Sequence, residues 1–285
     1  VGGGLIFGDY NIPNIALNNL HPGELPMWPL LFVTIACGAI SGFHSTQSPI
    51  MARCTTNEKE GRKIFYGAMV AEGIVALIWA AAAMTFFQGT GGLNEAMTSL
   101  GGPAGIVHEI TGTMMGVVGG VLAMLGVIAA PITSGDTAFR SVRLTLSDIF
   151  GLEQKSIKNR LIFAIPIFIV GGALSQINFD ALWRYFAWSN QTVAMVVLWA
   201  GAMWLAKRGK NHWIASIPAF FMTAVSVTYI LYAPEGFQLA YNFSVIAGIV
   251  VAIITMGIYI TKINSTHFEE EVILSEQEQV EEQVV

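Results

Sequence analysis

The sequence has 285 residues, of which 54% are apolar and only 12% are Asp, Glu, Lys or Arg. Soluble domains contain about 25% charged residues, and the mean hydropathy here is +0.60. This composition excludes an ordinary soluble protein and predicts an all-α integral membrane protein. The two cysteines are too few for a disulfide framework or a cysteine-rich metal site. We expect no metal and no cofactor.

The net charge of −5 comes from the C-terminal end of the chain. Seven of the 19 acidic residues follow Lys262, and no basic residue does. Residues 1–262 carry 14 basic and 12 acidic side chains, a net charge of +2 without a nucleic-acid-type basic patch. We therefore expect residues 263–285 to form an acidic, solvated tail and expect no nucleic-acid partner.

Apolar runs that are candidates for crossing a membrane as helices occur seven times along the chain. They are residues 26–43, 64–87, 112–133, 161–177, 189–206, 213–232 and 238–261. The first and fourth runs are short or interrupted by proline, and the others are strong. We therefore expect about seven transmembrane helices.

The basic residues orient these helices. The loops after the first, third, fifth and seventh runs contain every Lys and Arg except Arg184. Basic loops stay on the cytoplasmic side, so residues 1–25 are predicted as an extracytoplasmic lead-in, 26–262 as the transmembrane domain and 263–285 as a cytoplasmic tail. An external N-terminus without a signal sequence leads us to expect further helices upstream.

Polar residues at membrane depth cost about 2.5 to 3.5 kcal/mol each on insertion scales, so each is a functional candidate. The first such segment surrounds the end of run 26–43, where a glycine-flanked break could free backbone groups to hold a ligand or ion. We predict a substrate pathway here, formed by Gly38, Gly42, His44, Ser45, Gln47 and Ser48. The alternative is that the segment before Pro49 simply ends a helix at the cytoplasmic interface.

Glu72 is the second candidate, because it interrupts a continuous apolar run with no Lys or Arg within a helical turn. A buried carboxylic acid with a raised pKa can carry a proton. The alternative is a neutral side chain that hydrogen bonds to a neighbouring helix.

The third candidate lies at residues 130–143, after Pro131. Hydroxyl and carboxylate oxygens suit a sodium ion or a proton relay. The predicted cation site consists of Thr133, Ser134, Asp136 and Thr137. The alternative is that Ser134 or Asp136 caps a helix that runs to Phe150.

The fourth candidate is residues 182–195, which begin with tryptophans and a tyrosine typical of an interfacial aromatic belt. Asn190 and Gln191 follow at the start of run 189–206 and are further candidates for the substrate pathway.

Two segments carry a resemblance to a known family. The first, TIACGAISGFHSTQSPIMARC, and the second, NEKEGRKIFYGAMVAEGIVALIWAAAAM, closely resemble the carbon starvation protein A (CstA) family. The similarity extends through ITSGDTAFRSVR and LWRYFAWSNQTVA to about residue 262. The family's HHF and AGAGPLxGP signatures are not in this sequence, so the resemblance implies the C-terminal portion of such a protein, without its N-terminal repeat.

The resemblance implies a secondary transporter of the prokaryotic inner membrane that imports peptides, pyruvate or both during carbon starvation, coupled to protons or another cation. It further implies a fold of the amino-acid, polyamine and organocation type. The first five spans would then be helices six to ten, which form the second inverted repeat, and the last two would be peripheral. Helix six would be the broken, substrate-contacting helix, and Thr133 and Ser134 would be cation ligands on helix eight.

Three other classes compete with a carrier. A polar-lined channel for small solutes is the main alternative. A retinal protein needs a lysine in the middle of the seventh span, which residues 238–261 lack. An enzyme is not expected, because His108 and Glu109 begin a zinc-protease-like HExxH motif but residue 112 is glycine. The oligomeric state cannot be read from the sequence.

Overall fold

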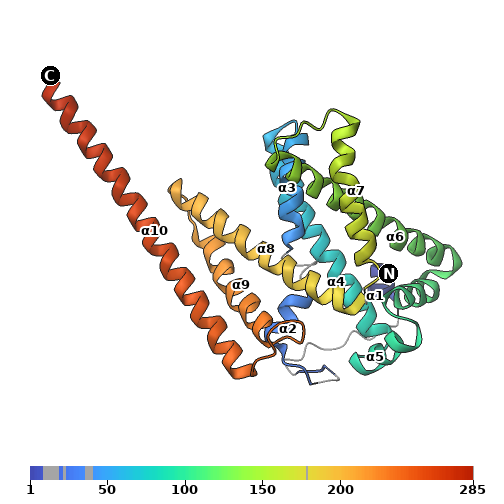
Figure 1. The fold of residues 1–285 in the computed structure, drawn as a ribbon. Coiled ribbons are helices and arrows are strands. Elements are labelled where there is room, and N and C mark those ends of the chain that lie inside the picture. The colour runs from blue at the N-terminus through green and yellow to red at the C-terminus, as the bar shows by residue number, and fades with distance from the viewer. Residues whose placement is uncertain (9–18, 22–23, 36–40, 178, 285) are drawn as a thin grey trace. The chain divides into compact units, whose positions relative to one another are not determined.

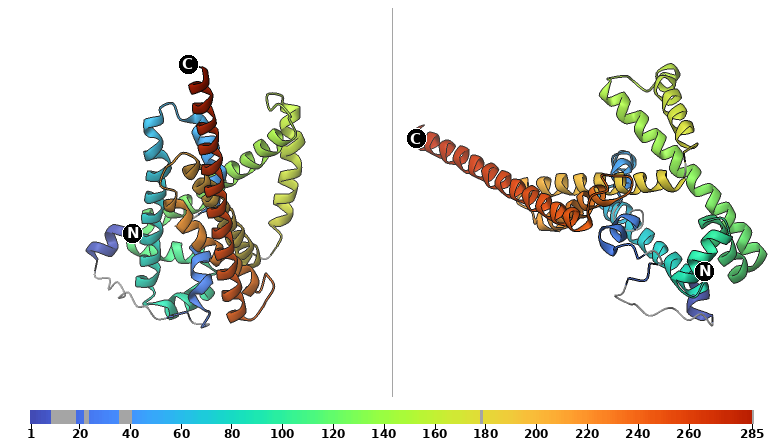
Figure 2. Two further views of the ribbon diagram at one scale, coloured as in Figure 1. Left: turned by 90° about the vertical axis from the view of Figure 1, so that its left-hand side faces the viewer. Right: turned by 60° about the horizontal axis from the view of Figure 1, so that its bottom comes forward.

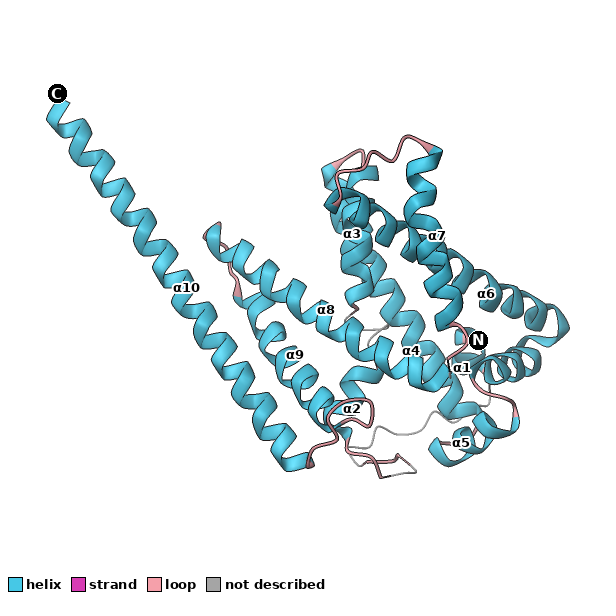
Figure 3. Cartoon of the chain, viewed as in Figure 1, coloured by secondary structure: helices cyan, strands magenta, loops and turns pink. Residues whose placement is uncertain are grey.

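A computed structural model describes residues 1–8, 19–21, 24–35, 41–177 and 179–284. Within these residues the chain forms helices and loops and no strand, which confirms the all-α fold class (Figure 3). The helices are α1 (Gly2–Phe7), α2 (Met27–Thr34), α3 (Gly42–Cys54), η1 (Glu58–Glu60), η2 (Arg62–Gly67), α4 (Ala68–Phe86), α5 (Thr90–Ser99), α6 (Pro103–Ile149), α7 (Ile157–Leu174), α8 (Phe179–Lys207), α9 (Trp213–Tyr232) and α10 (Tyr241–Val284).

Five helices in the described part of the chain are long and apolar enough to cross a membrane. They are Glu58–Phe86, Pro103–Ile149, Ile157–Leu174, Trp213–Tyr232 and Tyr241–Asn264. Each coincides with a predicted run. The predicted span 26–43 is instead divided between α2 and α3, and 189–206 lies in α8, which has 29 residues but is more polar.

The chain forms two compact units. The first comprises Val1–Met27 and Thr46–Ile177. Its core joins α1, α4, α5 and α6 through five buried apolar residues: Leu5, Ala82, Ala96, Ile106 and Ile110. The described residues 1–8 therefore pack in the same unit as the membrane helix α4.

The long helix α6 bends at Gly116, whose φ of 68° and ψ of −167° are not helical. L-residues with a side chain rarely adopt such a positive φ, so glycine is required at this bend. Further along, α6 packs against α7 through Phe139 and Phe168, whose ring centroids lie 4.7 Å apart. A Cβ on Gly171 would lie 2.8 Å from the Phe139 ring, so this glycine lets α7 approach α6 closely.

The second unit comprises Trp28–Ser45 and Asn178–Val285. Helix α9 lies between α8 and α10 and contacts both (Figures 1 and 2). The core combines Val33 of α2 with residues of α8 and α9 and of the turn that follows α9. These are Ala187, Met222, Val225, Tyr229 and Ala233. This packing fixes α2 against the helix pair.

Polar side chains also join α8 to α9. Trp188 Nε1 donates to the Ser226 carbonyl at 3.2 Å, and the hydroxyls of Thr192 and Ser226 lie 2.7 Å apart. Trp199 Nε1 donates to Thr223 Oγ1 at 3.0 Å. Such interhelical hydrogen bonds are one of the forces that hold helices together in lipid.

Gly248 generates a prediction about the α9–α10 contact. A Cβ at this position would clash with Thr228 Oγ1 and lie 2.8 Å from the Ala224 carbonyl oxygen. We expect Gly248→Ala to lower the free energy of unfolding by about 1 to 3 kcal/mol through overpacking. Thermal or denaturant unfolding in detergent measures this change.

Gly257→Ala is the matched control, because it adds the same methyl group to α10 at a position with nothing within 4 Å. Equal stability of the two variants would contradict the close α9–α10 contact.

Candidate functional site

The predicted break in the first span has a structural counterpart. Helix α2 ends at Thr34 and α3 begins at Gly42, while Ile35 and Ser41 are not helical. Gly38 lies outside the described residues. The alternative, in which the segment before Pro49 ends a helix, is wrong because α3 continues through Pro49 to Cys54.

A helix break leaves carbonyls at the end of one helix and amides at the start of the next without helical partners. Helix α8 provides partners on both sides. Gln191 Nε2 donates to the Phe32 carbonyl of α2 at 2.7 Å, and Asn190 Oδ1 accepts from the Phe43 amide of α3 at 2.6 Å. Asn190 Nδ2 also donates to Ser41 Oγ at 3.1 Å. These two predicted pathway residues thus hold the ends of the break.

Both amide side chains are almost completely buried, with 6% of Asn190 and 1% of Gln191 exposed. Gln191 Oε1 is buried without a hydrogen-bond partner among the described residues. It leaves a free acceptor beside the break. Unpaired buried acceptors are rare in folded proteins and call for an explanation.

Gly42 lies where α3 touches the backbone of α8. An added Cβ would clash with the Asn190 carbonyl oxygen and lie 2.7 Å from Val193 Cβ and 2.9 Å from the Ala194 nitrogen. The sequence suggested glycine for its backbone freedom. The structure shows that glycine is needed here for space.

The remaining pathway candidates lie on α3. His44, Gln47 and Ser48 are spaced to share one face of this helix. The Ser45 hydroxyl donates to the Gly42 carbonyl at 2.5 Å, and Gln47 Nε2 donates to Thr46 Oγ1 at 3.2 Å. Gln47 Oε1 is buried and has no hydrogen-bond partner in the described part of the chain. It is a second free acceptor.

The predicted cation site lies inside α6, since Gly102 is the residue that precedes this helix. The capping alternative for Ser134 and Asp136 is therefore wrong. The hydroxyl of Thr133 donates to the Ala130 carbonyl at 2.9 Å, and that of Thr137 to the Thr133 carbonyl at 2.8 Å.

The carboxylate of Asp136 has its own cationic partner. It forms an ion pair with Arg140, one helical turn later, at 2.6 Å. This pairing reduces the charge that Asp136 can offer to a bound cation. The assignment of a cation to this segment stays a prediction.

Glu72 is partly buried in the second turn of α4. The short π-helix η2 directly precedes α4, and such segments occur frequently at functional sites. The proton-linked role of Glu72 stays a prediction.

The sequence did not predict an ion pair between a half-exposed arginine, Arg184, and a buried carboxylate, Glu235. Arg184 Nε of α8 lies 3.3 Å from Glu235 Oε2 just after α9, and 3% of the Glu235 side chain is exposed. The Tyr229 hydroxyl donates to the other carboxylate oxygen. The sequence feature that could have predicted this ion pair is that Arg184 and Glu235 are a cation and an acid on the same predicted external side, where no other Lys or Arg occurs.

Metal binding has no support among the described residues. They contain no group of three or more His, Cys, Asp or Glu side chains that could hold a metal ion.

Comparison with known proteins links the chain to one family. The family model described as carbon starvation protein CstA matches residues 6–102 and 90–229. A relative from Haemophilus influenzae, named only as an uncharacterized protein, is 49% identical over 122 residues, which cover 43% of this chain and 88% of the relative. No solved structure matches significantly.

Two further relatives have names that state a function. The Escherichia coli peptide transporter CstA is 25% identical over 80% of this chain and 42% of its own length. The Escherichia coli pyruvate/proton symporter BtsT is 36% identical over 34% of this chain and 14% of its own length. The chain thus spans less than half the length of either transporter.

Asn190 provides a test of the break geometry. We expect Asn190→Ala to destabilise the protein by about 1 to 3 kcal/mol, because the Phe43 amide loses its acceptor in a buried setting. Thermal unfolding in detergent reports the change. Asn264→Ala, at an exposed position of α10, is the control. If both variants melt alike, α8 does not hold the break.

Proposed function

The chain belongs to the carbon starvation protein CstA family, and we propose that it acts in a secondary active transporter that imports a small carbon source by alternating access. The proposed location is the prokaryotic inner membrane, and the proposed context is carbon starvation. Five helices apolar enough to span a membrane support a multi-pass membrane protein. The proposed orientation has the N-terminal end of this chain outside and the acidic C-terminal end in the cytoplasm.

The observation that carries the proposal is that α2 ends at Thr34, α3 begins at Gly42, and buried side chains of α8 bind the ends of both helices. Irregular backbone at membrane depth occurs where it is buried in protein or lines a cavity, and transporters use broken helices to bind substrates. Gln191 Oε1 provides an unpaired acceptor beside this interruption. In this proposal His44, Ser45, Gln47 and Ser48 line the pathway beyond it.

The free acceptor of Gln191 favours a peptide as substrate. A side-chain amide oxygen accepts from an N–H group, and a peptide supplies both backbone and terminal N–H donors. Pyruvate is the second candidate, supported by the similarity to the pyruvate/proton symporter. As an anion without N–H or O–H donors, pyruvate would need the amide groups to present their N–H side instead.

Coupling to a cation is the remaining part of the proposal. Thr133 and Ser134 are the proposed ligands, since each hydroxyl oxygen keeps a lone pair for a cation even when its proton is donated to the backbone. Glu72 is the proposed carrier if the coupled ion is a proton. A channel differs from this carrier by letting solute equilibrate without accumulation.

Uptake into proteoliposomes tests the proposal, using the protein with any flanking sequence its gene encodes. We expect saturable accumulation of labelled di- or tripeptides, or of pyruvate, driven by an imposed proton or sodium gradient. We expect Gln47→Leu to lower the uptake efficiency about tenfold through loss of a substrate hydrogen bond.

Gln176→Leu is the control, because Gln176 also donates to the hydroxyl of its preceding residue but lies exposed after α7. Uptake that never saturates or accumulates would favour the channel, and equal effects of both variants would remove Gln47 from the pathway.

A double variant tests the coupling site. We expect Thr133→Ala with Ser134→Ala to raise the cation concentration needed for half-maximal uptake, while uptake at saturating cation persists. The measurement is uptake as a function of sodium concentration and of pH. Unchanged dependence on both ions would show that these hydroxyls do not bind the coupled cation.

A further inference from the structure

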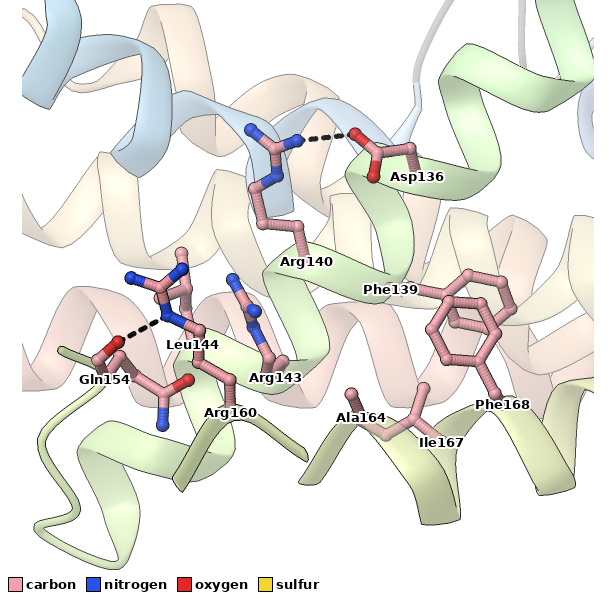
Figure 4. A pocket seen from close by; sticks show the side chains of 10 residues that line it. All are labelled: Asp136, Phe139, Arg140, Arg143, Leu144, Gln154, Arg160, Ala164, Ile167 and Phe168. Carbon is pink, nitrogen blue, oxygen red and sulfur yellow. Dashed lines mark hydrogen bonds and ion pairs between the residues drawn. The ribbon is translucent and has the colours of Figure 1, made fainter. Parts of the chain in front are cut away.

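A pocket of about 500 Å³ lies between α6 and α7 in the first unit (Figure 4). Three arginines and one glutamine contribute to its lining: Arg140, Arg143, Arg160 and Gln154. Every arginine of the pocket comes from the loop-proximal ends of these helices, on the side that the basic residues predict to be cytoplasmic. The proposed transport function uses none of these four residues.

The polar end of the pocket has N–H donors without a hydrogen-bond partner among the described residues, and it carries a positive charge. Asp136 pairs with Arg140, so the three arginines retain a net charge of two. Arg143 Nε and both polar atoms of the Gln154 side chain are buried and have no hydrogen-bond partner in the described part of the chain. Arg160 Nε donates to the Gln154 carbonyl at 2.6 Å, which holds this loop against α7.

The other wall of the pocket is apolar. Phe139 of α6 and Phe168 of α7 contact each other there, and Ile167 lies beside them (Figure 4). Phe168 is 59% exposed and lies in a helix that is apolar enough to span the membrane. The pocket therefore joins a cationic end to an apolar end along the helix pair.

We propose that this pocket binds the phosphate group of an anionic phospholipid. Guanidinium groups match phosphate oxygens in charge and in their forked donor geometry. Basic pockets between membrane helices on the cytoplasmic side bind lipid headgroups of this kind. The apolar wall fits the glycerol and acyl portion of a lipid, which free inorganic phosphate lacks. This assignment does not rest on the transported substrate, so it stands or fails independently of the proposed function.

Native mass spectrometry of the purified protein tests the assignment, with phosphatidylglycerol, phosphatidylcholine and inorganic phosphate as separate probes. We expect retention of phosphatidylglycerol by the unmodified protein, and a loss of affinity of about tenfold or more in Arg143→Gln with Arg160→Gln. Thermal unfolding in phosphatidylcholine alone checks that this variant folds. Arg143→Lys with Arg160→Lys keeps the charge and should bind at an intermediate level.

Lys155→Gln with Lys158→Gln is the matched control, because it removes the same charge from exposed positions of the same segment outside the pocket. We expect it to bind phosphatidylglycerol normally. Equal losses in both glutamine variants would show diffuse surface attraction and overturn the pocket. Stronger retention of inorganic phosphate than of phosphatidylglycerol would show that the ligand is not a lipid. Equal retention of phosphatidylcholine and phosphatidylglycerol would show that the pocket does not select anionic lipids.

Discussion

The backbone groups at the end of one helix and the start of the next lack helical partners, and where they are buried they must find partners elsewhere in the protein. In this chain the carbonyl of Phe32 and the amide of Phe43 find them in adjacent side chains of α8. That pairing requires α3 to approach the α8 backbone so closely that Gly42 has no room for a side chain. It also positions Val33 to pack in the core with Met222 and Val225 of α9.

Polar groups also pair with one another where the helices of the second unit meet. Its α8–α9 interface combines small and hydroxylated residues with tryptophan N–H groups, and the Ser226 carbonyl and hydroxyl both take part. Near the end of α9, burial of Glu235 is matched by Arg184 and the Tyr229 hydroxyl. Solvent reaches the half-exposed Arg184, but removing this arginine would leave the buried Glu235 carboxylate without its cationic partner. The pair joins the start of α8 to the turn that follows α9.

In the first unit, the structure divides the predicted cation site of α6 into two parts, the hydroxyl groups and the carboxylate of Asp136. The hydroxyls of Thr133 and Thr137 donate to carbonyls of α6 itself, whereas Asp136 pairs with Arg140, which lines the arginine-lined pocket. Cations are repelled and anions attracted by such a cluster. Family membership supports a transport function for the whole protein. It gives no role to the three arginines, which are recognised as a group because they line one pocket.

The sequence alone determined the helical class, the apolar runs that correspond to five helices long and apolar enough to span a membrane, and the start of a new helix near Gly42, because hydropathy and glycine patterns are local. It also contained the spacing of four residues between Asp136 and Arg140, although the capping alternative for Ser134 and Asp136 placed a helix start there that the structure does not have. Only the tertiary structure decided what Asn190 and Gln191 do, since their partners lie about 150 residues away along the chain. Hydrogen bonds between distant segments depend on how helices pack, and the pattern within one segment does not encode that packing.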